Sequence, residues 1–426
     1  MNCSSLFVLV SLFTLTSVRA HGQAYEWNVD ASGSWEDSND WLIIDAPAGS
    51  YPNNPNDFVL FSDNISAPRS ITLHQDATIN VFNLVFSSTQ PYSILAGTYG
   101  LNEIVLWSDD MVIGNINVTG GPYTISTNLD SPYQIFLGGV GSLIVGGVNT
   151  YSVPTFISSE TILIAGSTTG LSPVSTYNLS SGGTLALGTG GTYYDSHIGY
   201  LTDDAGGGPW TVSMGSASLV LLTGGNFDGV IEGSGGIFLL GGTLAFQGVN
   251  TFTGSSIVYS GTELSLNGSG SLSCPIQMDG NFSITGITPS VYIFNQVLSG
   301  AGLVTLGSKT FEFASAETST YSGSFTGSGG VTISNGSVVF NGTAVTSDYS
   351  GTTTISNSAN LTAATANCMS PNSPIYLAGT GSFVVQGSNT VLSISGDSDN
   401  NYTIDIQNTD LSLLQGGGMD INFGGV

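Results

Sequence analysis

One phrase occurs three times in this chain: Gly141-Ser-Leu-Ile-Val-Gly-Gly-Val-Asn-Thr-Tyr151, Gly242-Thr-Leu-Ala-Phe-Gln-Gly-Val-Asn-Thr-Phe252 and Gly381-Ser-Phe-Val-Val-Gln-Gly-Ser-Asn-Thr-Val391. Each copy is a short β-like run between turn residues. A turn, a strand and a turn that recur over a long stretch are typical of stacked architectures, in which each unit buries its apolar face only against its neighbours. The phrase therefore predicts a repetitive fold, and it does not identify a ligand.

Similar apolar runs follow one another from about residue 100 onward. They include Glu103-Ile-Val-Leu-Trp107, Ile162-Leu-Ile-Ala165, Ser218-Leu-Val-Leu-Leu222, Gly236-Ile-Phe-Leu-Leu240, Val331-Thr-Ile-Ser334 and Tyr402-Thr-Ile-Asp-Ile406. Pairs such as Gly-Gly and Asn-Gly separate the runs, and these residues adopt positive φ at low cost. No stretch carries the apolar period of a helix. Because no linker divides the chain into sandwich-sized domains, the sequence predicts an all-β fold, a continuous parallel β-helix.

The composition supports a folded chain with many tight turns. Only 8% of the 426 residues are charged, where an ordinary domain has about 25%. Glycine, at 59 residues, is roughly twice its usual share of about 7%, and the 14 prolines are too few for a collagen repeat. Disorder is excluded because disordered chains lack core-forming residues, whereas 40% of this chain is hydrophobic.

The charge balance excludes several partners. The chain has 3 Lys and Arg against 29 Asp and Glu, for a formal net charge of −26. Arg19 lies in the apparent targeting segment, which leaves Arg69 and Lys309 in the mature chain. We therefore predict no nucleic-acid partner, because phosphate binding needs clustered cations. Anionic membranes are poor partners for the same reason.

Residues 1–20 read as a secretory signal peptide. An apolar stretch of about ten residues precedes the small-residue end Val18-Arg19-Ala20. A stretch of this length cannot cross a bilayer, which needs about twenty residues. We predict cleavage after Ala20 and no direct membrane span.

The mature chain divides into two predicted regions. Residues 21–100 carry Trp27, Trp35 and Trp41, and we interpret them as an N-terminal cap with the first coils, because a solenoid needs an atypical end unit. The tryptophans could instead line a carbohydrate site, since aromatic faces stack on sugars. Residues 101–426 are interpreted as passenger-like β-helix repeats.

Two cysteines, Cys274 and Cys368, remain after the signal is removed. In a solenoid that advances about 4.8 Å per coil, residues so far apart in sequence lie several coils apart. A disulfide requires Cα atoms within about 7 Å. We therefore predict two separate, buried thiols, and neither has the spacing of a zinc site.

The unit Gly248-Val-Asn-Thr-Phe-Thr-Gly254, with Gly261-Thr-Glu-Leu-Ser-Leu266 after it, resembles the autotransporter-associated β-strand repeat of bacterial autotransporter passengers. Degenerate copies are Thr320-Tyr-Ser-Gly323, Asp348-Tyr-Ser-Gly-Thr-Thr-Thr-Ile-Ser356, Gly229-Val-Ile-Glu-Gly-Ser-Gly-Gly236 and Val297-Leu-Ser-Gly-Ala-Gly-Leu303. The opening Gly33-Ser-Trp-Glu-Asp-Ser-Asn-Asp-Trp41 is similar to the start of many such passengers. The resemblance covers most of the mature chain.

This resemblance implies a right-handed parallel β-helix, exported and displayed on or released from the bacterial cell surface, often in adhesion. Its expected partner is a host-surface or extracellular glycan or protein ligand. No barrel-like series of alternating segments is present before Val426. The chain is accordingly interpreted either as a truncated product or as one that uses a separate outer-membrane translocator.

The sequence does not favour a catalytic role. Hydrolases need two carboxylates at a set separation, and the candidates are Asp109-Asp110 and Asp203-Asp204. Neighbouring residues on a strand point to opposite faces, and Arg69 and Lys309 lie too far apart in sequence for a lyase centre. The histidines His21, His74 and His197 have no partner motif and are interpreted as surface or turn residues.

For metal, Asp397-Ser-Asp-Asn-Asn401 has the alternating oxygens of a calcium loop, without the Gly and distal Glu that complete one. We interpret it as a solvated turn. The sequence therefore predicts no catalytic, cofactor-binding or metal-binding residues.

The predicted function is that of a secreted, structural or adhesive β-helical protein that acts through its surface. The alternative is a polysaccharide-active enzyme or carbohydrate-binding protein on the same fold. A fragment without independent function is a third reading. In each of them, Leu244 and Phe246 are expected to lie in the core, and Lys309 outside it.

Overall fold

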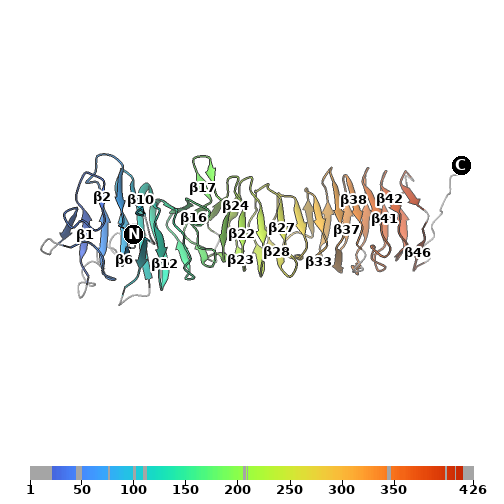
Figure 1. Cartoon of the computed structure of the whole chain (residues 1–426). Helices are drawn as coiled ribbons and strands as arrows, with labels where there is room; N and C mark the ends of the chain where they lie inside the picture. The colour runs from blue at the N-terminus through green and yellow to red at the C-terminus, as the bar shows by residue number, and fades with distance from the viewer. Residues whose placement is uncertain are drawn as a thin grey trace, which may run out of the picture. The chain divides into compact units, whose positions relative to one another are not determined.

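The computed structural model describes residues 22–44, 50–74, 77–98, 102–108, 113–204, 208, 210–342, 347–398, 401–407 and 409–415 (Figure 1). The predicted signal peptide, His21 and the Asp109-Asp110 pair lie outside these residues. The chain forms two compact units, residues 1–219 and 220–426. They are called the first and the second unit below, and each is described by itself.

Every element in the described part of the chain is a β-strand. Among these residues, no helix is long and apolar enough to serve as a membrane span. The predicted all-β, parallel solenoid is therefore confirmed. The predicted division at residue 100 stays a prediction.

In the first unit, parallel strands stack along three faces. One face consists of β1 (Ala24–Trp27), β4 (Phe58–Phe61), β7 (Asn83–Phe86), β10 (Ile113–Ile125), β12 (Gln134–Val145), β13 (Thr155–Ile157), β15 (Thr176–Leu179) and β20 (Tyr200–Asp203). A second face consists of β2 (Gly33–Ser34), β5 (Arg69–Thr72), β8 (Tyr92–Leu95), the later parts of β10 and β12, β14 (Ile162–Ala165), β16 (Thr184–Ala186) and β21 (Thr211–Ser213). The third consists of β6 (Thr78–Val81), β9 (Glu103–Leu106) and β11 (Asn128–Asp130).

The second unit repeats this arrangement. One face consists of β23 (Gly224–Phe227), β26 (Thr243–Phe246), β28 (Glu263–Gly268), β30 (Asn281–Ile287), β33 (Leu303–Gly307) and β36 (Ser324–Gly327). The next consists of β25 (Ile237–Leu239), β27 (Ser256–Val258), β29 (Ile276–Met278), β32 (Leu298–Gly300), β35 (Thr318–Tyr321), β38 (Ser337–Phe340), β40 (Asn360–Ala363), β42 (Ser382–Val385) and β45 (Thr403–Ile406). The last consists of β31 (Val291–Phe294), β34 (Thr310–Phe313), β37 (Val331–Ile333), β39 (Thr353–Ile355), β41 (Ile375–Leu377) and β44 (Ile394–Gly396). The strands β43 (Asn389–Val391) and β46 (Leu411–Leu413) form a separate parallel pair.

The remaining strands are β3 (Trp41–Ile44), β17 (Gly188–Thr189), β18 (Thr192–Tyr193), β19 (Ser196–Ile198), β22 (Leu219–Leu221) and β24 (Val230–Glu232). Two pairings depart from the parallel pattern, because β3 runs antiparallel to β1 and β17 runs antiparallel to β18.

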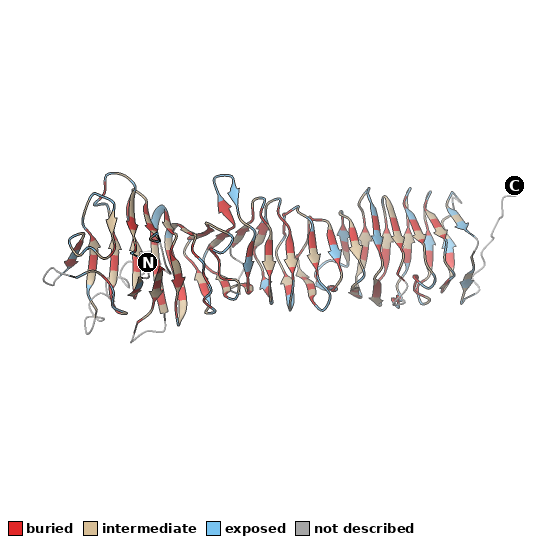
Figure 2. Cartoon of the chain, in the orientation of Figure 1, coloured by how far each residue is buried: buried red, intermediate tan, exposed pale blue. Residues whose placement is uncertain are grey.

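Side chains alternate between the interior and the surface along most strands, as Figure 2 shows. On β26, Leu244 and Phe246 are each 1% exposed, while Thr243 is exposed. Each coil places its apolar residue on the one before, so Leu244 pairs with Leu264, and Leu264 with Phe282. The expected core positions are confirmed. Lys309 is half-buried and lies outside this core.

The tryptophans of residues 21–100 form a buried cluster. Trp27 and Trp35 are fully buried and Trp41 is 4% exposed. The ring of Trp41 lies edge-on to both others, with centroid distances of 5.1 Å. Trp35 Nε1 donates to the Pro52 carbonyl at 2.9 Å. These ring faces pack on one another and on protein, so they are not available to stack on a sugar.

Candidate functional site

The candidate carboxylate pair Asp203-Asp204 does not form a two-acid site. Asp203 ends β20 opposite Leu179, in a row whose earlier members, such as Ile157, are apolar and buried. Asp204 is exposed, and its backbone N–H donates to the Leu179 carbonyl at 3.2 Å. Because successive residues of a strand face opposite sides, the two carboxylates do not share one substrate.

A cluster of Ser34, Glu36 and His74 brings together the side-chain types of a hydrolytic triad. The Ser34 hydroxyl lies 2.9 Å from His74 Nδ1, and Glu36 Oε2 lies 2.8 Å from that same nitrogen. A triad needs the acid on one ring nitrogen and the nucleophile on the other. With both groups at Nδ1 and the Ser34 hydroxyl donating to Glu36 Oε2 at 2.8 Å, the cluster does not have the arrangement of a triad.

Glu36 is instead the centre of this cluster. Partial burial pushes its pKa upward, but hydrogen bonds from the His74 backbone N–H and the Ser34 hydroxyl outweigh burial and lower the pKa below its usual value. The His74 ring is 71% exposed. His74 is therefore a surface residue, as expected, but it has a carboxylate partner that the sequence did not reveal. His197 is exposed on β19.

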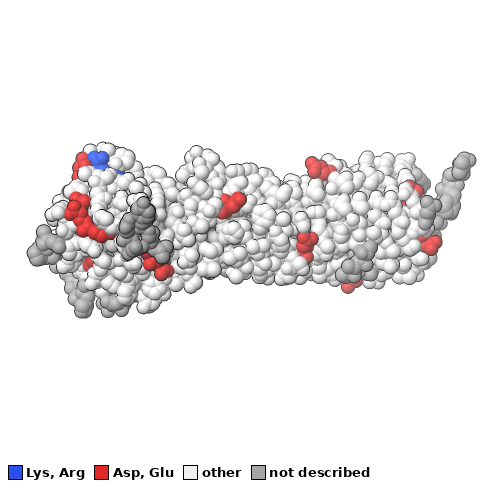
Figure 3. All heavy atoms as spheres, in the orientation of Figure 1, with Lys and Arg blue, Asp and Glu red and all other residues white. Residues whose placement is uncertain are grey.

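Arg69, one of the few cations, is occupied by Asp30. Its Nη2 lies 2.6 Å from Asp30 Oδ1, and the hydroxyl and backbone N–H of Ser66 donate to the same carboxylate. The two Ser66 hydrogen bonds and then Arg69 lower the pKa of Asp30 to about 2. On the face drawn in Figure 3, basic side chains are few and acidic ones are scattered. The ion pair between Arg69 and Asp30 thus joins two segments of the first unit.

The candidate calcium loop is only partly described. Asp397 Oδ2 accepts a hydrogen bond from the Gly379 backbone N–H at 2.6 Å, while Asp399 and Asn400 lie outside the described residues. Within the part of the chain that the structure describes, no three His, Cys, Asp or Glu side chains come together as a metal site would require.

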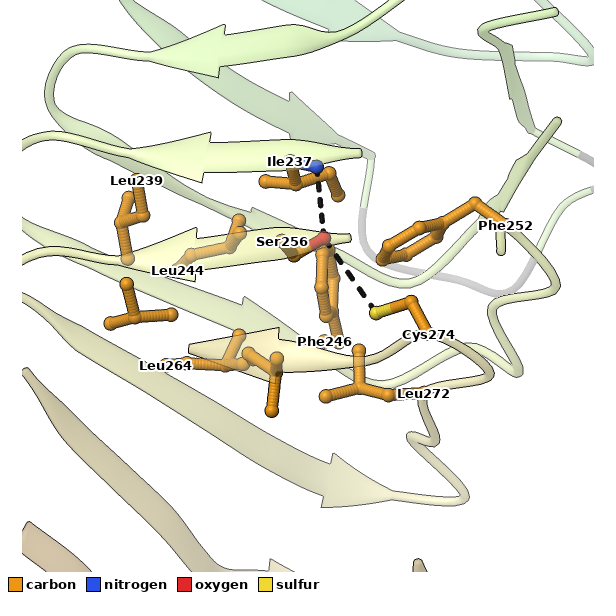
Figure 4. A pocket seen from close by; sticks show the side chains of 11 residues that line it. Ile237, Leu239, Leu244, Phe246, Phe252, Ser256, Leu264, Leu272 and Cys274 are labelled. Carbon is orange, nitrogen blue, oxygen red and sulfur yellow. Dashed lines mark hydrogen bonds between the residues drawn. The ribbon is translucent and has the colours of Figure 1, made fainter. Parts of the chain in front are cut away.

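An internal gap in the second unit lies among β25 to β29 (Figure 4). Its free space is no larger than about one water molecule. The lining side chains are Ile237, Leu239, Leu244, Phe246, Phe252, Ser256, Val258, Leu264, Leu272, Cys274 and Ile276. The one hydroxyl, of Ser256, accepts from the Ile237 backbone N–H at 2.9 Å. The gap is a packing void in the core and offers no room for a substrate.

The repeated phrase places one buried asparagine in each copy. Asn149, Asn250 and Asn389 are 2%, 0% and 2% exposed. Each side-chain oxygen accepts a hydrogen bond from a backbone N–H of the preceding coil, namely Leu129, Ile231 and Met369. These contacts span 19 or 20 residues of sequence. The asparagines therefore bind one coil to the next.

The amide nitrogens complete these bridges. Asn149 Nδ2 donates to the Gly170 carbonyl at 2.6 Å, and Asn250 Nδ2 lies 3.3 Å from the Ser271 carbonyl, each 21 residues further on. Asn389 Nδ2 donates to the Thr365 and Gly387 carbonyls instead. A single side chain thus satisfies backbone groups in two or three coils, which a buried polar group must do to avoid a penalty.

Two buried hydroxyl clusters have the same plan. In the first unit, Tyr151, Thr155 and Ser175 are linked by contacts of 3.2 and 3.3 Å. In the second, the corresponding side chains, Tyr349, Thr353 and Ser373, are linked at 2.6 and 2.8 Å. Ser172 and Ser370 then donate to the carbonyls of Tyr151 and Tyr349. All four positions shift together, from 151, 155, 172 and 175 to 349, 353, 370 and 373.

The buried phenols predict a loss of stability in alkali. Burial raises the pKa of Tyr349 to about 12, against hydrogen bonds from Thr353 and Ser373, and burial also raises the pKa of Tyr151. An unfolded tyrosine titrates near pH 10, so the native state keeps its protons longer. The stabilisation by the neutral phenols is complete below pH 10 and is lost as the pH rises towards 12. We expect the melting temperature to fall between pH 10 and pH 12. A melting temperature that stays level over this range would contradict this prediction.

The two cysteines are expected to be inert in the folded chain. Both are free and buried, as the sequence predicted. Burial raises the pKa of Cys274 to about 11 and raises that of Cys368, and the thiolate is the reactive form. Ellman's reagent at pH 8 should label neither residue until denaturant is added. A Thr243→Cys variant, with an exposed thiol on β26, is the positive control. Rapid labelling of native Cys274 or Cys368, located by peptide mapping, would refute the assignment.

No protein-family model, curated protein or solved structure matches this chain.

Proposed function

We propose that this chain is a secreted or surface-displayed structural or adhesive protein, similar to an autotransporter passenger, that works through the surface of its β-solenoid and not by catalysis. The observation that carries the proposal is the use of its buried polar groups. Asn149, Asn250 and Asn389 and both hydroxyl clusters bind coil to coil. These buried polar side chains, whose types often serve in catalysis, here form hydrogen bonds within the scaffold.

The charge supports the same role. A formal net charge of −26 makes separate copies repel one another and keeps an exported chain soluble. The guanidinium of Arg69 is already paired with the carboxylate of Asp30 in the same chain. A scaffold that contacts its partner through neutral polar and aromatic side chains fits this charge balance best.

Location tests the proposal. Cells that produce the protein are fractionated, and an antibody locates it in cytosol, periplasm, outer surface and medium. Protease added to intact cells is the control for surface exposure, with a periplasmic marker that must stay intact. We expect protease-accessible protein at the surface or in the medium. Protein confined to the cytosol or the periplasm would overturn the proposal.

A further inference from the structure

A row of side chains crosses the outside of the first unit on the face of β1 to β20. The parallel register places Asn115 beside Phe136, Phe136 beside Phe156, Phe156 beside Asn178, and Asn178 beside Thr202. All five side chains are half-buried, and they alternate with buried core residues. We call these five residues the phenyl row.

The two rings form a platform. The centroids of Phe136 and Phe156 are 6.4 Å apart and their planes differ by 25°. Among the ring pairs that the described residues make, this is the pair in which neither ring is buried. Core packing does not explain a ring pair that remains partly open to solvent, because outward positions of a strand need no apolar side chain.

One edge of the platform lies against a glycine. Gly138 follows Phe136 on the same face and is buried, and a Cβ there would lie 3.4 Å from Phe136 Cε1, so the ring packs closely against this backbone. On the other side, Gln134, Thr176 and Tyr200 carry half-buried polar groups, and Thr176 and Tyr200 are directly paired. The rings thus lie between Gly138 and a polar border.

One polar group of the phenyl row lacks a partner. Asn178 Oδ1 is buried and has no hydrogen-bond donor in the described structure. Such a group costs free energy until something donates to it. Rotation about the terminal side-chain bond of asparagine is soft, so this oxygen can turn to meet a hydroxyl group placed over Phe156.

The phenyl row contains no charge, and the chain as a whole repels anions. A ligand that suits it has apolar faces for the rings and many hydroxyl groups for the amides, without ionised groups. A peptide strand is a poor fit, because this is a sheet face and not an edge with free backbone groups. We propose that the phenyl row is a binding platform for a neutral oligosaccharide. This inference rests on the proposed function, whose ligand class it names.

Affinity gel electrophoresis tests the platform directly. The full chain is run through native gels that contain laminarin, dextran or hydroxyethyl cellulose, with polygalacturonate as the anionic comparison. We expect at least one neutral polysaccharide to retard the chain. Phe136→Ala and Phe156→Ala should each weaken the retardation about tenfold, as the loss of one aromatic contact predicts. No retardation in any neutral gel, or retardation by polygalacturonate alone, overturns the inference.

A second variant guards against misfolding. Gly138→Thr keeps both rings and the inward-facing core residues, but its side chain meets the Phe136 ring and displaces it from the platform. It should therefore also weaken retardation, and the melting temperature shows that the chain stays folded. Tyr259→Ala removes a 40% exposed ring of the second unit and should change nothing. Undiminished binding by Gly138→Thr and Phe156→Ala would refute the platform. If the protein is surface-exposed but binds no neutral glycan, this inference fails and the proposed function stands; a cytosolic protein would sink the proposed function itself.

Discussion

A Phe246→Asp chain is expected to lose the folded structure of its second unit at room temperature. Removing a buried phenylalanine side chain costs about 3 to 5 kcal/mol, and Phe246 is 1% exposed between Phe227 and Leu266. A carboxylate there would be buried without a partner, which costs several kcal/mol more. Since whole domains are stable by about 5 to 15 kcal/mol, the sum is comparable to the total. Thermal unfolding followed by circular dichroism measures the effect.

Three comparisons make this result specific. Leu244→Asp, two residues earlier on the same inward face, should behave alike. Asn226→Asp adds the same charge at an exposed position of the neighbouring β23 and should change the melting temperature little. Lys309→Ala should also leave the chain folded. Equal melts for the four variants would show that the core of the second unit is wrongly assigned.

The second large effect is expected at a polar side chain. Asn250→Ala leaves the Ile231 N–H without its partner. It also removes one donor from each of the Gly248 and Ser271 carbonyls, which keep the backbone N–H groups of Ser271 and of residue 250. An unsatisfied buried group costs about 1 to 3 kcal/mol, and we expect a loss of that size. Urea unfolding measures it as a lower midpoint. Asn226→Ala, at an exposed strand position, is the matched control.

An Asn250→Asp variant tests the acceptor contact of residue 250 separately from its donor contacts. Asn250→Asp keeps an acceptor for the Ile231 N–H but turns a carboxylate oxygen towards two carbonyls. Burial raises the pKa of this carboxyl in the folded state, so the destabilisation is greatest at neutral pH and is relieved as the pH falls through that pKa. If Asn250→Ala and Asn226→Ala shift the urea midpoint equally, Asn250 is not an inter-coil bridge.

The sequence predicted the fold well because the solenoid is governed by local alternation. The phrase around Leu244 and Phe246 has one side chain inward and the next outward, and turn residues bound it, so the strand and its core face can be read from eleven residues. The unpaired state of Cys274 followed from coil spacing alone. These features depend on neighbours in sequence or on the rise per coil.

The polar interior could not be predicted in the same way. Asn250 stands beside Gly248, where an asparagine is equally typical of an exposed turn, and its partners lie 19 and 21 residues away. The pairing of His74 with Glu36 spans 38 residues. The one sequence signal was that all three copies of the phrase keep asparagine in the same place, which a turn alone does not demand. The phenyl row likewise emerges only when the register is known.

The hydroxyl clusters require a fixed number of residues between their members. Paired strands of adjacent coils in the second unit are offset by 18 residues at Glu263 and Asn281 and by 23 residues at Ser337 and Asn360, so coil length varies there. Within both clusters the Tyr-to-Thr separation is 4 and the Thr-to-Ser separation is 20. An insertion or deletion of one residue between Thr353 and Ser373 would place a hydroxyl one position out of line and reverse its facing. Descendants of this chain are therefore free to vary in length at most coils, while these two coils must keep a fixed count.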